Sequence, residues 1–476
     1  MRLSCVALLV ASLGLGGCAQ FGGLFGTVGP DYTASAPPAA PAWIANQLPH
    51  DGSPRRLAAW WAQFDDPTLT ALIDAAQSAS PTLAQAAASV ERARADSVAA
   101  GVAGQPGVEA IASANRAAIT FGGPVLIRSQ YQAGVQASWE IDLFGGLARQ
   151  REAAQAHLAA SDAAWHDARV AVAAETANAY VEFRFCEMQV ALAVADGASR
   201  AETARLAAAA SQAGFQAPAT AALAHASAAD AAAALTQQRA ACRRAIKGLT
   251  ALTALEEATV DRLLGEAART ARLPEPAAFQ VAAVPARVLA QRPDIAAAER
   301  TLAATSAEIG IAEAQRYPRL TLAGSITPTR AQFGTAPAFS ATTWSIGPSL
   351  TLPLVTGGRL TANIAAARAR YIAAESDYRA RARNAVREVE EALVRLEAAA
   401  ARATDLAAAE KGYVTYLDAT ILRQRNGLAN LTEVEDARRT ALAARGASGL
   451  LQRERVAAWV ALYRAVGGGW NTDKQP

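Results

Sequence analysis

The sequence predicts a mixed α and β membrane protein, in which β-strands belong to a barrel and very long helices form coiled-coil hairpins. Three observations support this fold class. Residues Trp344–Leu354 alternate between apolar and small or polar side chains, as in a strand with one apolar and one polar face. Runs of helix-forming residues are too long for a compact domain. The same plan also occurs twice along the chain, which indicates a tandem internal duplication.

The composition favours helix over most of the chain. There are 476 residues with a formal net charge of +3, and 52% are hydrophobic although only 6% are aromatic, because alanine supplies the difference. Long runs of Ala, Leu, Arg, Glu and Gln favour helix. So small a net charge gives no reason to expect nucleic acid as a partner. Beyond the N-terminus no apolar run reaches about 18 residues, so a membrane crossing would use a barrel.

The N-terminus has the pattern of an export signal. In residues 1–17 a positive charge at Arg2 precedes an apolar stretch, as in a signal peptide. Leu15-Gly16-Gly17-Cys18 resembles the lipobox of bacterial lipoproteins, which implies cleavage before Cys18 and acylation of its sulfur and amino group. The alternative is an ordinary secretory signal with an incidental cysteine. Residues 18–55 are rich in Gly, Pro, Ala and Ser and are predicted to form an extended, lipid-anchored tether.

The strand pattern occurs in four segments, near residues 108–118, 131–141, 319–327 and 344–354, with a loop over 119–129. Strands of about 9–11 residues with this alternation fit a transmembrane barrel. Tyr131 and Trp344 at one end, and Trp139 at the other, suit the aromatic girdles at the two membrane interfaces. A half-buried strand in a soluble sheet is the alternative. Four strands cannot close a barrel and open edges cannot face lipid, so several copies must share one barrel.

Proline and glycine positions recur at a constant offset. Pro81 and Pro293 each open a helix, and 293 − 81 = 212; the strand-ending glycines Gly145 and Gly357 have the same offset. We therefore expect a first structural repeat over residues 56–272 and a second over 273–476. Each repeat reads helix, strand, loop, strand, very long helix, turn and helix. The helix predicted from Gly358 to Arg425 would be about 100 Å long, so such helices must pack lengthwise against one another.

Several motifs carry a resemblance to a known family. They are Leu289-Ala-Gln-Arg-Pro-Asp-Ile-Ala-Ala-Ala-Glu299, Asp142-Leu-Phe-Gly-Gly146, Gly347–Leu354 with Gly357-Gly-Arg359, Glu388–Leu393 and Leu462–Trp470. Together with the lipobox, they resemble the TolC-like outer-membrane efflux channels, in the lipoprotein branch of that family. The resemblance covers nearly the entire mature chain.

The resemblance implies a homotrimer whose twelve strands form one outer-membrane β-barrel, continued by a long periplasmic α-helical barrel that is closed at its tip. The implied partners are outer-membrane lipid, a periplasmic adaptor (membrane fusion) protein and an inner-membrane transporter of the RND type. The implied function is the exit duct of a tripartite efflux pump, which passes drugs or other toxic small molecules to the outside. Two alternatives are the exit duct of a type I-like protein-secretion system and a periplasmic lipoprotein scaffold without a pore.

Enzyme motifs are missing from the sequence. The histidines are His50, His157, His166 and His225, and none belongs to HExxH or to a Cys/His cluster with zinc-ligand spacing. The sequence contains no G-x-S-x-G elbow and no P-loop. We expect no catalytic residues, no metal and no cofactor. Arg292-Pro293-Asp294 is interpreted as a helix start, with proline in the first turn and a carboxylate at the positive end of the helix dipole.

Two helix breaks form the candidate functional site, because they resemble the periplasmic tip turns of the family. The resemblance implies a gate and an adaptor contact at Gly214, Phe215, Thr220, Arg425, Gly427, Leu428, Leu431 and Glu433. The alternative is that each glycine only ends a helix in the left-handed conformation. Family members often carry a carboxylate six residues after the glycine. Glu433 retains it in the second turn, whereas Thr220 replaces it in the first. We expect Arg425 and Glu433 to pair across neighbouring chains, with Leu428 and Leu431 facing an adaptor.

Cys186 and Cys242 lie at equal distances from the first turn, since 214 − 186 = 28 and 242 − 214 = 28. In an antiparallel helical hairpin these positions face each other. An oxidising periplasm permits a disulfide between them, which needs Cα atoms about 4.4–6.8 Å apart. Two buried free thiols are the alternative.

Overall fold

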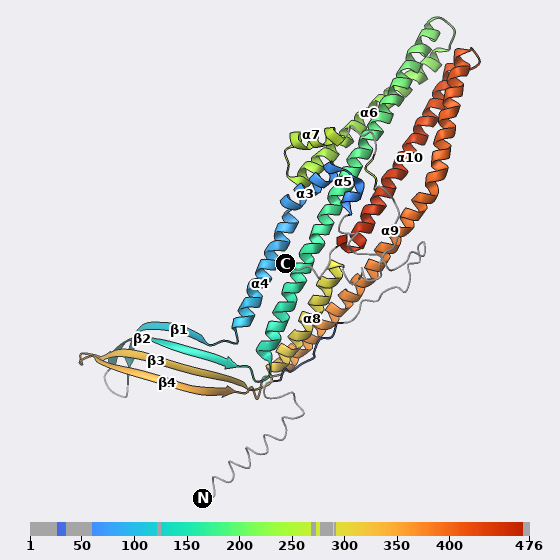
Figure 1. Ribbon diagram of the computed structural model, residues 1–476. Coiled ribbons are helices and arrows are strands. Elements are labelled where there is room, and N and C mark those ends of the chain that lie inside the picture. The colour runs from blue at the N-terminus through green and yellow to red at the C-terminus, as the bar shows by residue number, and fades with distance from the viewer. Residues whose placement is uncertain are drawn as a thin grey trace. The chain divides into compact units, whose positions relative to one another are not determined.

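The computed structural model describes residues 26–34, 60–120, 125–267, 273–276, 289 and 292–469. The predicted signal peptide, Cys18 and most of the predicted tether lie outside these residues. The first half contains η3 (Trp61–Phe64), α3 (Pro67–Ala79), α4 (Pro81–Val102), β1 (Gly107–Ile119), β2 (Leu126–Ile141), α5 (Gly146–Gln212), α6 (Pro218–Thr253) and α7 (Glu257–Ala267) (Figure 1). The second half contains α8 (Pro293–Ala314), β3 (Arg319–Phe333), β4 (Phe339–Thr351), α9 (Arg359–Arg425), α10 (Leu431–Ala465) and η5 (Gly467–Gly469).

The element order confirms the predicted tandem duplication. The helices α4 and α8 begin 212 positions apart (293 − 81), and α5 and α9 begin 213 apart (359 − 146). Both α5 and α9 have 67 residues, which corresponds to about 100 Å of helix each. The short helix α7 was not predicted, and it has no counterpart in the described part of the second half. Of the helices described, none combines the length and the hydrophobicity that a bilayer crossing requires.

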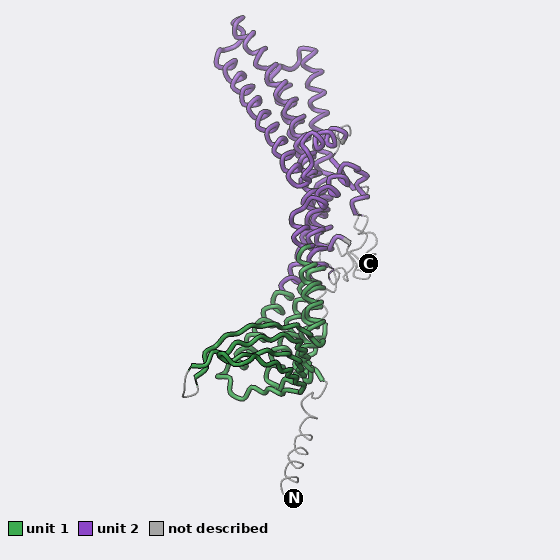
Figure 2. The backbone as a smooth tube through the Cα atoms, turned by 90° about the vertical axis from the view of Figure 1, so that its left-hand side faces the viewer, with its two compact units in different colours: residues 1–35, 88–162, 297–379 green, residues 36–87, 163–296, 380–476 purple. Residues whose placement is uncertain are grey.

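The chain divides into two compact units, which have separate colours in Figure 2. Unit 1 comprises residues 1–35, 88–162 and 297–379 and contains the β-sheet. Unit 2 comprises residues 36–87, 163–296 and 380–476 and contains both helical hairpin turns. Each unit therefore takes equivalent segments from both halves of the sequence, as expected when two repeats fold together.

Unit 1 is built around one antiparallel sheet with strand order β1-β2-β3-β4. The strands β1 and β4 are therefore its two edges. One face carries exposed large apolar side chains, because alternate residues of each strand point to the same side. These are Val108 on β1, Tyr131, Val135 and Trp139 on β2, Ile326 on β3, and Trp344, Ile346 and Leu350 on β4.

The opposite face of the sheet is polar. Gln136 donates a hydrogen bond to Glu109 across β1 and β2 (3.0 Å), and the hydroxyls of Ser325 and Ser345 are 3.1 Å apart across β3 and β4. The structure thus confirms the two-faced strands that the sequence alternation predicted.

The strands are longer than predicted at the end away from the helices. β2 begins at Leu126 and β4 at Phe339, so residues 126–129 of the predicted loop belong to β2. The earlier start of β4 also changes its register. Tyr131 pairs with Arg330, which pairs with Ser340, so Trp344 lies four residues nearer the helices than the Tyr131 row. The prediction that Tyr131 and Trp344 share one girdle is therefore wrong, because their strands start at different heights.

Part of the predicted tether is fixed against unit 1. The Val28 amide donates to the Phe144 carbonyl (3.1 Å), and Gly29 packs so closely on Gly310 that a Cβ there would lie 2.4 Å from the Gly310 Cα. The buried Arg149 side chain donates to the carbonyls of Val28 (3.1 Å) and Gly29 (3.3 Å). Residues 26–34 are thus a docked strap and not a free linker.

In unit 2 the predicted helix start at Arg292 is also a clamp. Its side chain, only 7% exposed, donates to both carboxylate oxygens of Asp294 (2.9 and 2.7 Å) and pairs with Glu388 of α9 (2.8 Å). It also donates to the Ala465 carbonyl at the end of α10 (2.9 Å). One buried guanidinium therefore joins the start of α8, the middle of α9 and the end of α10. This role depends on side chains far apart in the sequence and was not predicted.

Candidate functional site

The first hairpin turn, between α5 and α6, ends α5 with a left-handed glycine. Gly214 has φ +78°, its amide bonds to the Ser211 carbonyl (3.1 Å), and the Phe215 amide bonds to the Ala210 carbonyl (2.9 Å). This is the Schellman pattern, in which glycine avoids the steric cost of a Cβ at positive φ. Phe215 follows the glycine and is 87% exposed.

The second turn, between α9 and α10, repeats this geometry. Gly427 has φ +72°, its amide bonds to the Gln424 carbonyl (3.0 Å), and the Leu428 amide bonds to the Arg423 carbonyl (2.8 Å). Leu428 occupies the place of Phe215 and is 69% exposed. The glycines thus serve as helix terminators in both turns, and each turn presents one large apolar side chain to its surroundings.

The two turns start their second helices differently. α6 begins with Pro218 after Ala217, which offers no side-chain cap, and the amide of the exposed Thr220 donates to the Ala217 carbonyl (3.0 Å). α10 begins with a capping box, in which Asn430 accepts from the Glu433 amide (2.9 Å) and Glu433 accepts from the Asn430 amide (3.3 Å). The carboxylate that distinguishes the second turn therefore stabilises its own helix.

Glu433 also lies near a cation of its own chain. Its Oε2 is 3.7 Å from Nη2 of Arg423, which donates to the Leu428 carbonyl (3.0 Å). Both side chains are about half exposed, so this pair contributes no more than about 1 kcal/mol. Arg425, the expected partner, is exposed at the end of α9. Pairing of Arg425 with Glu433 between chains stays a prediction. Leu431, at the first position of α10, is half-buried.

Behind the turns, a buried carboxylate links the two hairpins. Glu435 of α10 is 2% exposed and accepts hydrogen bonds from the Ser199 hydroxyl of α5 and from Arg438 (2.8 Å). Arg438 also donates to the Ser199 hydroxyl (3.2 Å). Burial raises the pKa of the Glu435 carboxyl, and the nearby Arg438 opposes this rise. Sequence reasoning missed this link, because Ser199 and Glu435 are 236 residues apart.

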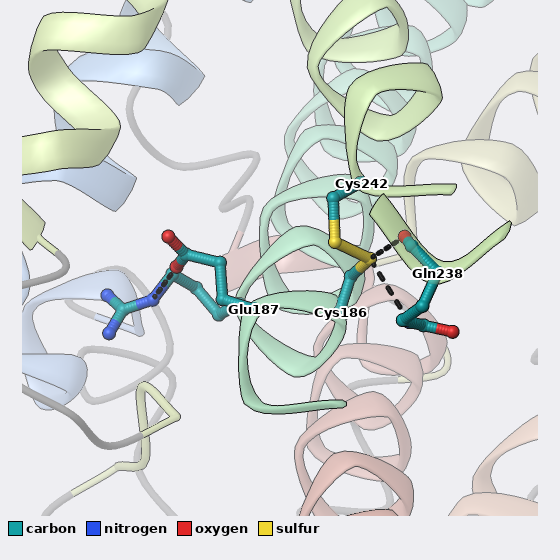
Figure 3. The surroundings of a disulfide bond; sticks show 5 residues. Cys186, Glu187, Gln238 and Cys242 are labelled. Atoms are coloured by element: carbon teal, nitrogen blue, oxygen red, sulfur yellow. Dashed lines mark hydrogen bonds and ion pairs between the residues drawn. A yellow bond between two sulfur atoms is a disulfide. The ribbon is translucent and has the colours of Figure 1, made fainter. Parts of the chain in front are cut away.

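Cys186 of α5 and Cys242 of α6 form a disulfide in the structure, with their Cα atoms 5.6 Å apart (Figure 3). The bond closes a sequence separation of 56 residues across the first hairpin. Gln238, one turn before Cys242, donates to the Cys186 sulfur (3.3 Å), and the neighbouring Glu187 pairs with Arg184 (3.2 Å). The geometry agrees with the equal spacing of both cysteines from Gly214. Its formation in the periplasm stays a prediction.

Among the residues that the structure describes, no cluster of His, Cys, Asp or Glu side chains is arranged to hold a metal ion. The predicted lipid attachment at Cys18 falls outside those residues. The described site therefore consists of two exposed hairpin turns, the polar link behind them and the disulfide across the first hairpin.

Comparison with known proteins gives a consistent result along the whole chain. The family model of the outer membrane efflux protein matches residues 72–255 and 284–468. The outer membrane protein OprJ of Pseudomonas aeruginosa is 29% identical over 488 aligned positions, covering 98% of this chain and 96% of OprJ. The nodulation protein T of Rhizobium leguminosarum bv. viciae is 32% identical over 372 positions, 77% of this chain and 74% of that protein.

A solved outer-membrane channel structure also resembles the chain over most of its length. The outer-membrane channel OprN superposes with a TM-score of 0.81 at 29% sequence identity, covering 93% of this chain and 99% of OprN.

Proposed function

The chain belongs to the outer membrane efflux protein family, and on that premise we propose that it is the outer-membrane exit duct of a tripartite efflux pump. Small molecules pass through it from the periplasm or the pump to the outside. The observation that carries the proposal is the four-stranded sheet, with an exposed apolar face, a polar opposite face and edge strands β1 and β4. Such edges are stable in lipid only when copies of the chain close the sheet into a barrel.

The proposed assembly is a homotrimer with a twelve-stranded barrel. The helices α5 and α9, each about 100 Å long, extend from the barrel into the periplasm and line a tunnel. The chain catalyses nothing in this proposal, and energy comes from an inner-membrane transporter of the RND type that a periplasmic adaptor connects to the tunnel. Acylated Cys18 anchors the N-terminus in the membrane, and the strap at residues 26–34 joins that anchor to unit 1.

The hairpin turns are the proposed gate and adaptor contact. Phe215 and Leu428 support this role, because an exposed apolar side chain at each turn offers a partner contact area. Glu433 holds the closed state through an ion pair with Arg425 of a neighbouring chain. Exposed ion pairs contribute only about 0–1 kcal/mol each, so modest binding energy from an adaptor is enough to break all three.

The gate assignment needs a control for helix stability. Glu433 is also half of a capping box, so Glu433→Ala removes a carboxylate and loosens α10 at once. Asn430→Ala breaks the same capping box but keeps the carboxylate. If the carboxylate holds the gate, Glu433→Ala opens the channel much more than Asn430→Ala. Equal opening by both variants contradicts the ion-pair gate and assigns the effect to fraying of α10.

Efflux itself is tested in cells. A strain without this protein should accumulate more of a fluorescent dye such as ethidium than a strain that expresses it together with a periplasmic adaptor and an inner-membrane transporter of the RND type. The opposite result has two parts: both strains accumulate the same amount of dye, and a secreted protein is missing from the medium of the deletion strain. That result contradicts drug efflux and supports the secretion alternative.

A further inference from the structure

The end of the sheet away from the helices, called here the distal end, carries positive charge without negative charge. Arg116 lies near the end of β1, Arg128 near the start of β2 and Arg330 near the end of β3. Between Glu109 and Glu140, and from residue 320 to residue 358, the sequence contains no Asp or Glu. Any anion that reaches the distal end therefore meets guanidinium groups without competing carboxylates from these strands.

The strand register places two of these arginines on the apolar face. Arg330 pairs with Tyr131 and with Ser340, two rows beyond Ile326 and its partner Trp344 on the same face. Arg116 lies two residues beyond Ala114, the β1 partner of Tyr131, and therefore on the same face. Both side chains are exposed, and within the described chain neither takes part in a hydrogen bond or ion pair.

Arg128 faces the other way. It pairs with Ala117 and Phe333, one position out of phase with Arg116, and its guanidinium lies 5.9 Å from the centre of the Phe333 ring. It is therefore at a similar height on the polar face, which makes it a matched control for the other two.

Distance along the strand places the two outward arginines at a membrane interface. Ten residues separate Leu320, at the helix end of the apolar face, from Arg330. At about 3.3 Å per residue and a strand tilt of about 40°, this corresponds to about 25 Å along the membrane normal. That is about the height of the apolar band of an outer-membrane barrel. An outward arginine is costly at mid-membrane but nearly free of cost at the interface.

We propose that Arg116 and Arg330 form a binding site for the phosphate groups of the glycolipid in the outer leaflet of the outer membrane. The inference rests on the proposed barrel, which turns the distal end towards that leaflet. Arginine suits this ligand because its planar guanidinium binds phosphate oxygens through two parallel hydrogen bonds. Two strand spacings, about 10 Å, separate β1 from β3, so both side chains reach one phosphorylated headgroup.

The test uses the purified full-length protein in detergent and purified lipid A as the probe. Native mass spectrometry counts bound lipid A for the wild type, Arg116→Gln/Arg330→Gln and Arg128→Gln. We expect the double variant to bind at least about tenfold more weakly, and Arg128→Gln to bind like the wild type. Enzymatically dephosphorylated lipid A should bind the wild type as weakly as intact lipid A binds the double variant. Comparing intact with dephosphorylated lipid A on the wild type tests the site without any mutation.

Several results overturn the site. These are wild-type binding by the double variant, an equal loss in Arg128→Gln, and equal binding of dephosphorylated lipid A. Inorganic phosphate at 10 mM tests for a free-anion site, and full displacement of lipid A by it rejects the lipid assignment. Channel conductance of the same preparations separates the two proposals: normal conductance without lipid A binding rejects this site and leaves the exit duct intact.

Discussion

Replacing Arg292 with alanine should destabilise unit 2 more than any exposed arginine replacement. The side chain is 7% exposed and contacts Asp294, Glu388 and the Ala465 carbonyl at 2.7–2.9 Å. Its removal leaves a carboxylate and a carbonyl in surroundings that water reaches poorly. Breaking one side of a buried ion pair costs about 3–5 kcal/mol. For a unit of this size, that lowers the melting temperature by roughly 6–20 °C.

Arg387→Ala is the matched control. Arg387 lies next to Glu388 on α9 and pairs with Glu391 at 2.7 Å, but it is 56% exposed. Its loss should cost less than about 1 kcal/mol. Arg292→Lys should recover little of the stability that Arg292→Ala loses, because lysine cannot reproduce the bidentate contact with Asp294.

Thermal unfolding in detergent, followed by tryptophan fluorescence, measures the difference. The stacked rings of Trp60 and Trp459, 4.6 Å apart in unit 2, report on this region. A melting temperature for Arg292→Ala equal to that of Arg387→Ala refutes the clamp.

Three further predictions concern the hairpins and the anchor. Glu433→Ala should raise the conductance of the isolated channel in bilayer recordings, whereas Thr220→Ala should barely change it; unchanged conductance in both variants removes the gate from these turns. Cys186 and Cys242 should yield no free thiol in the unreduced, unfolded protein, and Cys242→Ser should lower stability by about 2–4 kcal/mol; two reactive thiols in the wild type end that assignment. Cys18→Ser should abolish acylation and leave assembled trimer, because the barrel holds the protein in the membrane; intact-mass analysis that finds an unmodified wild-type N-terminus contradicts the lipid anchor.

The architecture could be predicted from the sequence wherever backbone chemistry determines it. Pro81 and Pro293 start equivalent helices, and Gly214 and Gly427 end equivalent ones, because few other residues suit those backbone positions. The starts of β2 and β4 were harder to predict from the sequence. Val125, Leu126 and Ile127 form an unbroken apolar run, and Phe339 lies among small and polar residues, so neither strand start shows an alternation to detect. Pairing with neighbouring strands extends both segments.

The side-chain network of the site was only partly predictable. The Asn430–Glu433 capping box has a recognisable Asn-x-x-Glu spacing that could have been found before the structure. The Ser199–Glu435 link could not, because its partners meet only after two hairpins pack together.

Single-channel recording in planar lipid bilayers tests the central claim most directly. Purified wild-type protein should insert and give discrete, uniform current steps, and Glu433→Ala should give larger steps. A correctly folded oligomer that inserts into the bilayer without conducting ions, even with Glu433→Ala, contradicts the exit duct and supports a scaffold without a pore.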